Sequence, residues 1–141
     1  MLRLMLMTGL LLLAAESAAQ QMVVFEIGPL VSKKGSVRVA VYHNAHEFPE
    51  NPFCTLVFCK DSLEGAWMIC TTTSISPGNY AFSAMDDENE SGTMEYNRIG
   101  LPAEAFGFAN NPRILLRTPA FDKCTVAVTP PETRIKIILR R

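Results

Sequence analysis

The chain has 141 residues, with 13 Lys and Arg against 14 Asp and Glu, so its formal net charge is −1 at neutral pH. This balance lacks the surplus of positive charge with which proteins bind nucleic acid, and it excludes that class by bulk electrostatics. Residues 20–141 have the length of one ordinary domain, and we expect a single domain there.

The N-terminal segment has the layout of a secretory signal peptide. Arg3 supplies a short positive region, an apolar run covers residues 4–15, and the small residues 17–19 precede a cleavage position before Gln20. The run is shorter than the ~20 apolar residues of a membrane-spanning helix, which disfavours an anchor. We therefore predict a signal peptide over residues 1–19, export to the periplasm or the medium, and a mature chain that does not span a membrane.

Alternating apolar residues predict short β-strands along the mature chain. The clearest pattern lies in residues 36–42, where Val37, Val39 and Val41 share one face. The predicted strands cover residues 22–27, 36–42, 53–60, 66–73, 80–85, 113–117, 124–129 and 133–140. About seven or eight short strands separated by turn signals predict an all-β fold, an antiparallel β-sandwich of immunoglobulin-like or transthyretin-like type.

Four cysteines, an even number in an exported protein, favour two disulfides. Cys54 and Cys59 end the same predicted strand about 16 Å apart, which is too far to bond. Cys59 and Cys70 flank a turn over residues 61–65 and could face each other across a hairpin. The second disulfide would then join Cys54 to Cys124. Buried, unpaired thiols are the alternative, and zinc is disfavoured because no CxxC spacing occurs.

The segment 43–52 reads as a loop that carries both histidines. His43 and His46 are three residues apart, a spacing that suits metal ligands on one helical face. No cysteine or carboxylate completes a known metal pattern, so we expect ordinary loop histidines. Trp67, the single tryptophan, is expected to be a packing residue rather than a platform for a ligand.

Residues 86–111 form the longest predicted loop, and we expect it to be ordered and to be the principal exposed feature. Its front is acidic, which is typical of solvated surface. Phe106 and Phe108 are expected to anchor the loop, because ordered loops are held by their own side chains. The acidic residues of the front are Asp86, Asp87, Glu88, Glu90 and Glu95.

Part of this loop resembles the first half of an EF-hand calcium loop, with oxygen-bearing side chains at alternate positions and Gly92 at the sixth. Arg98 stands where the bidentate acid of such a loop is required. The alternative is an acidic turn held by bonds from Asn and Asp side chains to the backbone. The candidate calcium ligands are Asp87, Asn89, Ser91, the carbonyl of Thr93, and Glu95.

An enzymatic reading has weak support in the sequence. Asp86, Asp87 and Glu88 would supply paired carboxylates, and His43 or His46 a base. No spacing links these groups, and no nucleophile elbow, HExxH motif or Gly-rich phosphate loop is present. A carboxylate-based hydrolase is therefore the least favoured function.

Four segments together resemble a bacterial exported family of uncharacterised proteins, domain of unknown function 2141. They are GSVRVAVYHNAHEFP (35–49), SPGNYAFSAMDDENESG (76–92), GLPAEAFGFANN (100–111), and AFDKCTVAV with TRIKIILR (120–128 and 133–140). The chain departs from the family pattern at Asp86, where members have His, at Ser91-Gly92, where they have Asn-Gly, and at residues 93–95, where they have Lys-Leu-Asp. The resemblance implies an exported β-sandwich with no established activity.

We expect a binding or accessory module that uses the loop 86–111 to contact a protein, a glycan or a small ligand. The alternatives are a calcium-stabilised structural domain, a carrier with a small ligand between the sheets, and, least favoured, the hydrolase. No cofactor is expected apart from the candidate calcium ion.

Overall fold

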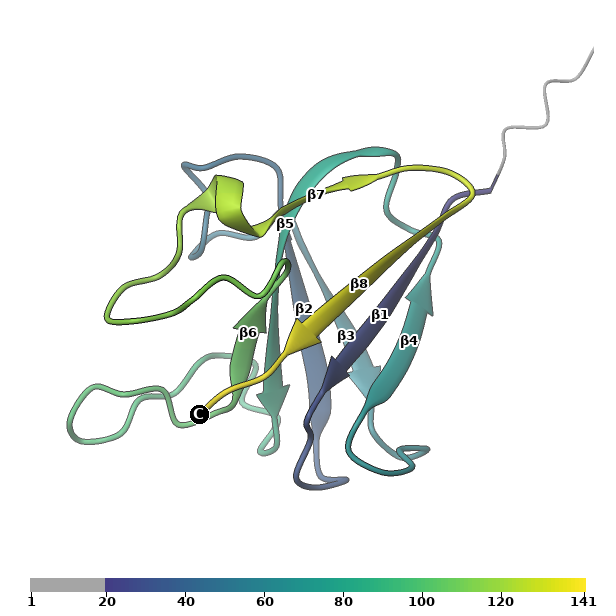
Figure 1. The fold of residues 1–141 in the computed structure, drawn as a ribbon. Coiled ribbons are helices and arrows are strands. Elements are labelled where there is room, and N and C mark those ends of the chain that lie inside the picture. Colours follow the sequence, from purple (N-terminus) through teal and green to yellow (C-terminus); the bar gives the residue numbers. More distant parts are fainter. Residues whose placement is uncertain (1–19) are drawn as a thin grey trace, which may run out of the picture.

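The computed structural model describes residues 20–141; the predicted signal peptide lies outside them. The regular structure of the described chain consists of β-strands and one short 3-10 turn, which confirms the predicted all-β class (Figure 1). No helix among these residues has the length and apolarity needed to cross a bilayer. The elements are β1 (Met22–Gly28), β2 (Ser36–Tyr42), β3 (Cys54–Cys59), β4 (Met68–Thr72), β5 (Gly78–Asp87), β6 (Phe106–Phe108), the 3-10 turn η1 (Phe121–Cys124), β7 (Thr125–Val128) and β8 (Glu132–Ile138).

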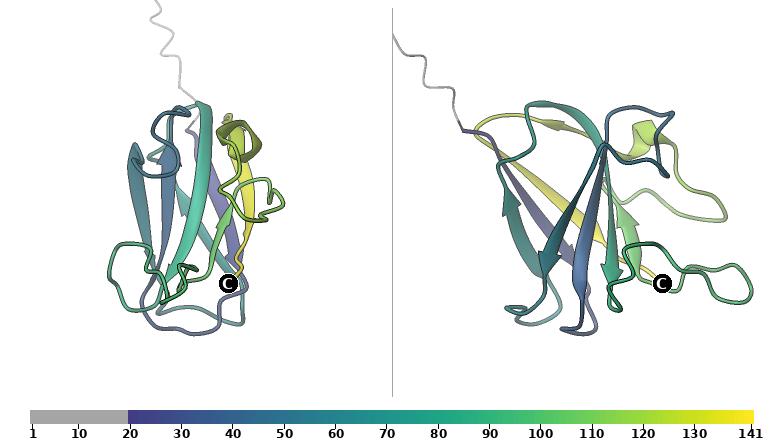
Figure 2. Two further views of the ribbon diagram at one scale, coloured as in Figure 1. Left: turned by 90° about the vertical axis from the view of Figure 1, so that its left-hand side faces the viewer. Right: turned by 180° about the vertical axis from the view of Figure 1, so that it is seen from behind.

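The strands form two sheets that face each other, as the predicted sandwich requires (Figure 2). The smaller sheet has the order β4-β1-β8, with β1 antiparallel to β4 and parallel to β8. The larger sheet has the order β3-β2-β5-β6, and its strand pairs are antiparallel. The final strand thus closes the smaller sheet beside the first one.

Strand β5 is the longest and has two neighbours on its outer edge. Its first part, from Gly78, pairs with β7, and its second part, at residues 83–85, pairs with β6. The chain leaves the sheet after β5, returns as β6, and leaves again before η1 and β7 (Figure 1). Two loops are therefore rooted on one edge of the larger sheet.

Apolar side chains from the facing sides of both sheets fill the space between them. Phe25 of β1 contacts Phe82 of β5 edge to face, with ring centroids 5.5 Å apart. A second apolar cluster covers the outer face of the larger sheet, where Phe48 packs against Tyr42 and Phe108. The fully buried core side chains include Val23, Phe25, Ile27, Val37, Val39, Val41, Phe82 and Ile137.

Two details of the predicted strand pattern are wrong. Strands β3 and β4 exist, but they belong to different sheets, so the predicted hairpin between them does not form. Residues 113–117 are not a strand, because Leu115 and Leu116 both face solvent and give no alternation. The strand at this edge is instead Phe106–Phe108, which lies inside the predicted loop.

Candidate binding loop

The loop 86–111 starts inside the protein rather than on its surface. Asp86 and Asp87 are the last two residues of β5, and neither is exposed to solvent. The prediction of a solvated acidic front is therefore wrong for these two residues. Lys60, which follows β3 directly, is equally buried, and its Nζ donates to Asp86 Oδ1 at 2.5 Å. The other oxygen of Asp86 has no hydrogen-bond partner among the described residues.

Asp87 holds the first turn of the loop. Its Oδ2 accepts from Arg38 Nε at 2.5 Å and from the backbone N–H of Gly92 at 3.0 Å, and its Oδ1 accepts from the N–H of Ser91 at 3.0 Å. Burial alone would raise the pKa of Asp87, but the Arg38 guanidinium and these two N–H groups lower it below its ordinary value. The carboxylate is thus held ionised by groups of its own chain.

The next residue, Glu88, ties the loop to two distant segments. The Ser32 hydroxyl donates to Glu88 Oε2 at 2.9 Å, and Arg141 forms an ion pair with Oε1. The pKa of Glu88 is lowered, first by the Ser32 hydrogen bond and also by the positive charges of Arg141 and Lys60. General acids need the opposite direction of shift, because they must hold a proton at neutral pH.

The candidate calcium ligands lie along this first turn, and their side chains bond to one another and to backbone groups. Asn89 Nδ2 donates to Glu95 Oε2 at 2.8 Å, and Ser91 Oγ donates to the carbonyl of Thr93 at 3.0 Å. Asp87 has the partners given above. Among residues 20–141, no group of three or more His, Cys, Asp or Glu side chains is placed to hold a metal ion. The calcium site stays a prediction.

Beyond the first turn the loop folds back on itself in a narrow projecting hairpin. The N–H of Ala103 donates to the carbonyl of Glu95, and the N–H of Asn97 donates to the carbonyl of Leu101, both at 2.8 Å. The Asn97 side chain closes the turn, because its Oδ1 accepts from the N–H groups of Ile99 and Leu101. The tip, residues 96–103, is consequently ordered although it projects into solvent (Figure 1).

The return of the loop to the sandwich is also anchored. Glu104 is buried, and its carboxylate accepts from the N–H of Glu95 at 2.9 Å. Phe106 and Phe108 pack in the outer apolar cluster, which confirms their predicted anchoring role. Asn111 then bridges to β8, since its amide donates to the carbonyl of Lys136 and its Oδ1 accepts from the N–H of Ile138.

The other candidate residues lie apart from this loop. His43 stacks on Phe53 with ring centroids 3.7 Å apart, and His46 is exposed. All four cysteines are free thiols in the structure. Cys59 faces solvent on the larger sheet and Cys70 is buried in the smaller one, so they do not face each other across a hairpin. The predicted pairing of Cys59 with Cys70 rested on that hairpin, whereas the prediction of two disulfides rested on the even number of cysteines.

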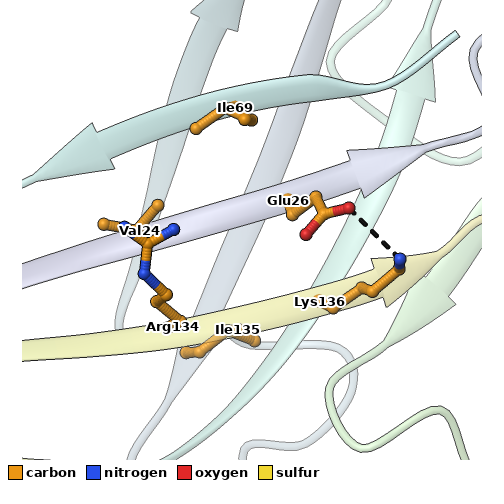
Figure 3. Close-up of a pocket in the computed structure, with 6 residues that line it drawn as sticks. All are labelled: Val24, Glu26, Ile69, Arg134, Ile135 and Lys136. Atoms are coloured by element: carbon orange, nitrogen blue, oxygen red, sulfur yellow. Dashed lines mark ion pairs between the residues drawn. The ribbon is translucent and has the colours of Figure 1, made fainter.

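A shallow hollow of about 100 Å³ lies on the smaller sheet, with Val24 at its floor (Figure 3). It is smaller than the roughly 300–1,000 Å³ of ordinary ligand pockets. Glu26 and Lys136 form an ion pair at 3.2 Å across its rim, and the Lys136 ammonium lies 4.4 Å from the Trp67 ring centroid. Trp67 lies at the surface of the smaller sheet, 36% exposed and outside both apolar clusters, so its role as a packing residue stays a prediction.

A family model described as an uncharacterized protein conserved in bacteria, DUF2141, matches residues 26–136. The chain belongs to the DUF2141 family. Searches among curated proteins and among solved structures gave no match. The matched region runs from β1 into β8 and contains the whole loop 86–111, so the loop is part of this DUF2141 domain.

Sequence reasoning missed Lys60 and Arg38, which hold the root of the loop in this DUF2141 domain. A signal for Lys60 was present, because it continues the inward-facing alternation of residues 54, 56 and 58. Asp86 likewise continues the inward face of β5 after Phe82 and Ala84. A charged residue at the end of an inward-facing series, on each of two strands, predicts a buried pair.

Proposed function

We propose that this DUF2141 protein is an exported binding or accessory module, and that the loop 86–111 is the surface with which it contacts its partner. The observation that carries the proposal is the contrast between the two ends of the loop. At the root, Asp86, Asp87 and Glu88 are bonded to groups of the same chain. At the tip, by contrast, the apolar side chains of Ile99 and Leu101 are exposed to solvent.

A rigid loop with exposed apolar side chains is suited to binding rather than to catalysis. Ordering the loop in advance reduces the entropy that is lost when a partner binds. Burial of an exposed apolar side chain against a partner is favourable, whereas a hydrated charge gains less because it must lose its water. These two features support the choice of a binding module over the other function classes.

Site-specific photo-crosslinking in the exporting cell tests this function. A photoreactive amino acid replaces Ile99 at the tip, and the matched control carries it at Ile69, another exposed isoleucine, on β4. We expect an adduct that forms only after irradiation and only from the Ile99 position. Equal adducts from both positions, or none from Ile99 in a folded and exported protein, would contradict the proposal.

Export is tested in the same cells. We expect the protein in the periplasmic or secreted fraction with Gln20 as its first residue, as measured by mass spectrometry of the intact chain. A chain that retains residues 1–19 in the cytoplasm would contradict the export part of the proposal and leave the tip-binding part to the crosslinking result.

A further inference from the structure

Two loops project from the same side of the sandwich, beyond the remaining elements on that side (Figure 1). The first is the hairpin tip, residues 96–103, and the second is residues 112–120, between β6 and η1. The view from behind shows both loops extending in the same direction, and the end-on view shows them apart from each other (Figure 2). The backbones of the two loops thus form two separate protrusions (Figure 2).

Both protrusions expose large apolar side chains. Ile99 in the hairpin tip is 79% exposed, and Leu116 in the second loop is 99% exposed. Their neighbours Leu101 and Leu115 are exposed as well, and Tyr96 adds an aromatic ring with a polar hydroxyl. Side chains of this kind are costly to leave in water and mark interaction surfaces when they cluster.

Positive charge accompanies these apolar groups, and negative charge is missing from both segments. The tip sequence YNRIGLPA contains Arg98, and the second loop, PRILLRTPA, contains Arg113 and Arg117; neither contains Asp or Glu. All three arginines are exposed, and the ion pairs of the described chain do not involve them. The nearest acid along the chain before the tip, Glu95, is hydrogen-bonded to Asn89.

The second loop is held in place by its own contacts. Ile114, between Arg113 and Leu115, packs against the outer apolar cluster that also contains Phe108 and Phe121. Leu115 and Leu116 therefore extend outward from a fixed base. The apolar residues of this loop divide into one that anchors it and two that face solvent.

We propose that the two protrusions together dock this protein on the surface of a membrane that contains anionic phospholipid. The inference rests on the proposed function, because it names the partner of the tip and adds the second loop to the contact. A bilayer suits two separate protrusions, because it accepts independent insertions along its surface. Apolar side chains would enter the headgroup region while arginines bind lipid phosphates, and tyrosine is favoured at that depth.

Vesicle co-sedimentation of the mature protein tests the inference. The probes are phosphatidylcholine vesicles and vesicles of equimolar phosphatidylcholine and phosphatidylglycerol. We expect binding to the anionic vesicles that weakens as salt is added, because surface charges are screened. Equal binding to both kinds of vesicle, or binding that salt leaves unchanged, would overturn the role given to the arginines.

Variants connect vesicle binding to the two loops. We expect the double variant Leu115→Ser/Leu116→Ser, and separately Ile99→Ser, to weaken binding by about tenfold or more. The control Ile69→Ser removes an exposed apolar side chain from β4 and should leave binding unchanged. The melting temperature of each variant is measured alongside, and full binding by folded loop variants would overturn the inference.

The remaining outcomes separate this inference from the proposed function. A protein adduct at Ile99 without vesicle binding would overturn the membrane inference and leave the binding function standing. Concentration-dependent dimerisation that Leu115→Ser/Leu116→Ser abolishes, again without vesicle binding, would overturn it in favour of a second copy. Neither adduct nor vesicle binding would overturn both.

Discussion

Lys60 and Asp86 form an ion pair in which neither side chain reaches solvent, with Nζ 2.5 Å from Oδ1. Lys60 follows the edge strand β3 and Asp86 lies near the end of β5, while β2 separates these strands in the sheet. The pair therefore connects the sheet edge to the strand that leads into the projecting loop. Asp86 depends on this single contact for its charge, because its second oxygen has no hydrogen-bond partner among the described residues.

Breaking this pair is expected to destabilise the fold strongly. Lys60→Met leaves the Asp86 carboxylate buried without a counter-charge, which typically costs about 3–5 kcal/mol of unfolding free energy. Urea unfolding followed by circular dichroism measures the loss. The control is Arg134→Gln, which breaks an exposed pair with Glu132 and should cost less than about 1 kcal/mol. Equal stabilities for the two variants would contradict the burial of the pair.

A double variant separates the value of the pair from the cost of an isolated charge. Lys60→Met/Asp86→Leu removes both charges and leaves apolar side chains, a replacement that is often neutral or stabilising. We expect it to recover most of the stability that Lys60→Met loses, in the same urea experiment. A double variant no more stable than the single one would show that the ionic contact itself stabilises the fold.

Asp87 is expected to make the free energy of unfolding depend on pH in the acidic range. Its folded-state pKa is lowered, so the folded state binds fewer protons than the unfolded state, and the stabilisation is present above the unfolded pKa of about 4. It is lost as pH falls through the lower folded-state pKa. We expect Asp87→Asn to be less stable than the wild type at pH 7 and the gap to narrow below pH ~4. A gap of constant size from pH 7 to pH 2.5, by urea unfolding, would contradict this prediction.

Alternation in the sequence was sufficient to predict most of the strands, because one face of each is buried against the other sheet. Which strands become neighbours was not predictable in the same way. The turn between β3 and β4 reads as a hairpin turn, but the chain crosses there from one sheet to the other. The disulfide between Cys59 and Cys70 was inferred from that wrong neighbour relationship.

The loop illustrates the same limit. Its length, its order and the anchoring by Phe106 and Phe108 were predictable from composition and from aromatic positions. Its root was not predictable, because the Asp87 carboxylate is paired with Arg38, a residue of another strand. Phe106–Phe108 is a strand because β5 runs beside it, and three residues are too few to show alternation.

A glycine near the root of the loop is expected to be irreplaceable. Gly35 has φ +71°, and a Cβ there would collide with the backbone carbonyl oxygen of Asp87. Gly65 has a similar φ of +76°, but a Cβ there would meet nothing within 4 Å. We expect Gly65→Ala to cost about 1 kcal/mol from backbone strain alone and Gly35→Ala clearly more. Matched thermal melts measure both, and equal losses would contradict the close approach of the two chain segments.

Thiol reactivity is expected to follow burial. Burial raises the pKa of Cys70 to about 12, and burial together with the charge of Asp122 raises that of Cys124 to about 11, which suppresses their reactive thiolates. We expect iodoacetamide at pH 8 to label the exposed Cys59 first and Cys54 more slowly, and the two buried thiols only after unfolding. Peptide mass spectrometry gives the order. An intact mass lower by two hydrogens per bond, before labelling, would contradict the free thiols and support the predicted disulfides.

The contacts of Asp87 oppose the calcium site that the sequence suggests, and we expect calcium to leave the stability of the domain unchanged. Both oxygens of Asp87 already accept hydrogen bonds from Arg38, Ser91 and Gly92, so coordination there would have to break these contacts. A ligand that binds only the folded state, at a hundredfold its dissociation constant, would add about 2.7 kcal/mol. That gain would raise the melting temperature of a domain of this size by several degrees.

The measurement is a non-reducing thermal melt in millimolar calcium and in excess chelator. The matched variant is Glu95→Gln, which removes the charge of a candidate ligand that is exposed and whose partner is Asn89. A calcium-dependent rise in the melting temperature of the wild type that disappears in Glu95→Gln would contradict the expected lack of effect. It would make the first turn an ion site. In that case the Asp87 contacts with Ser91 and Gly92 would describe the ion-free form of the turn, and binding would reorganise the base from which the hairpin tip projects.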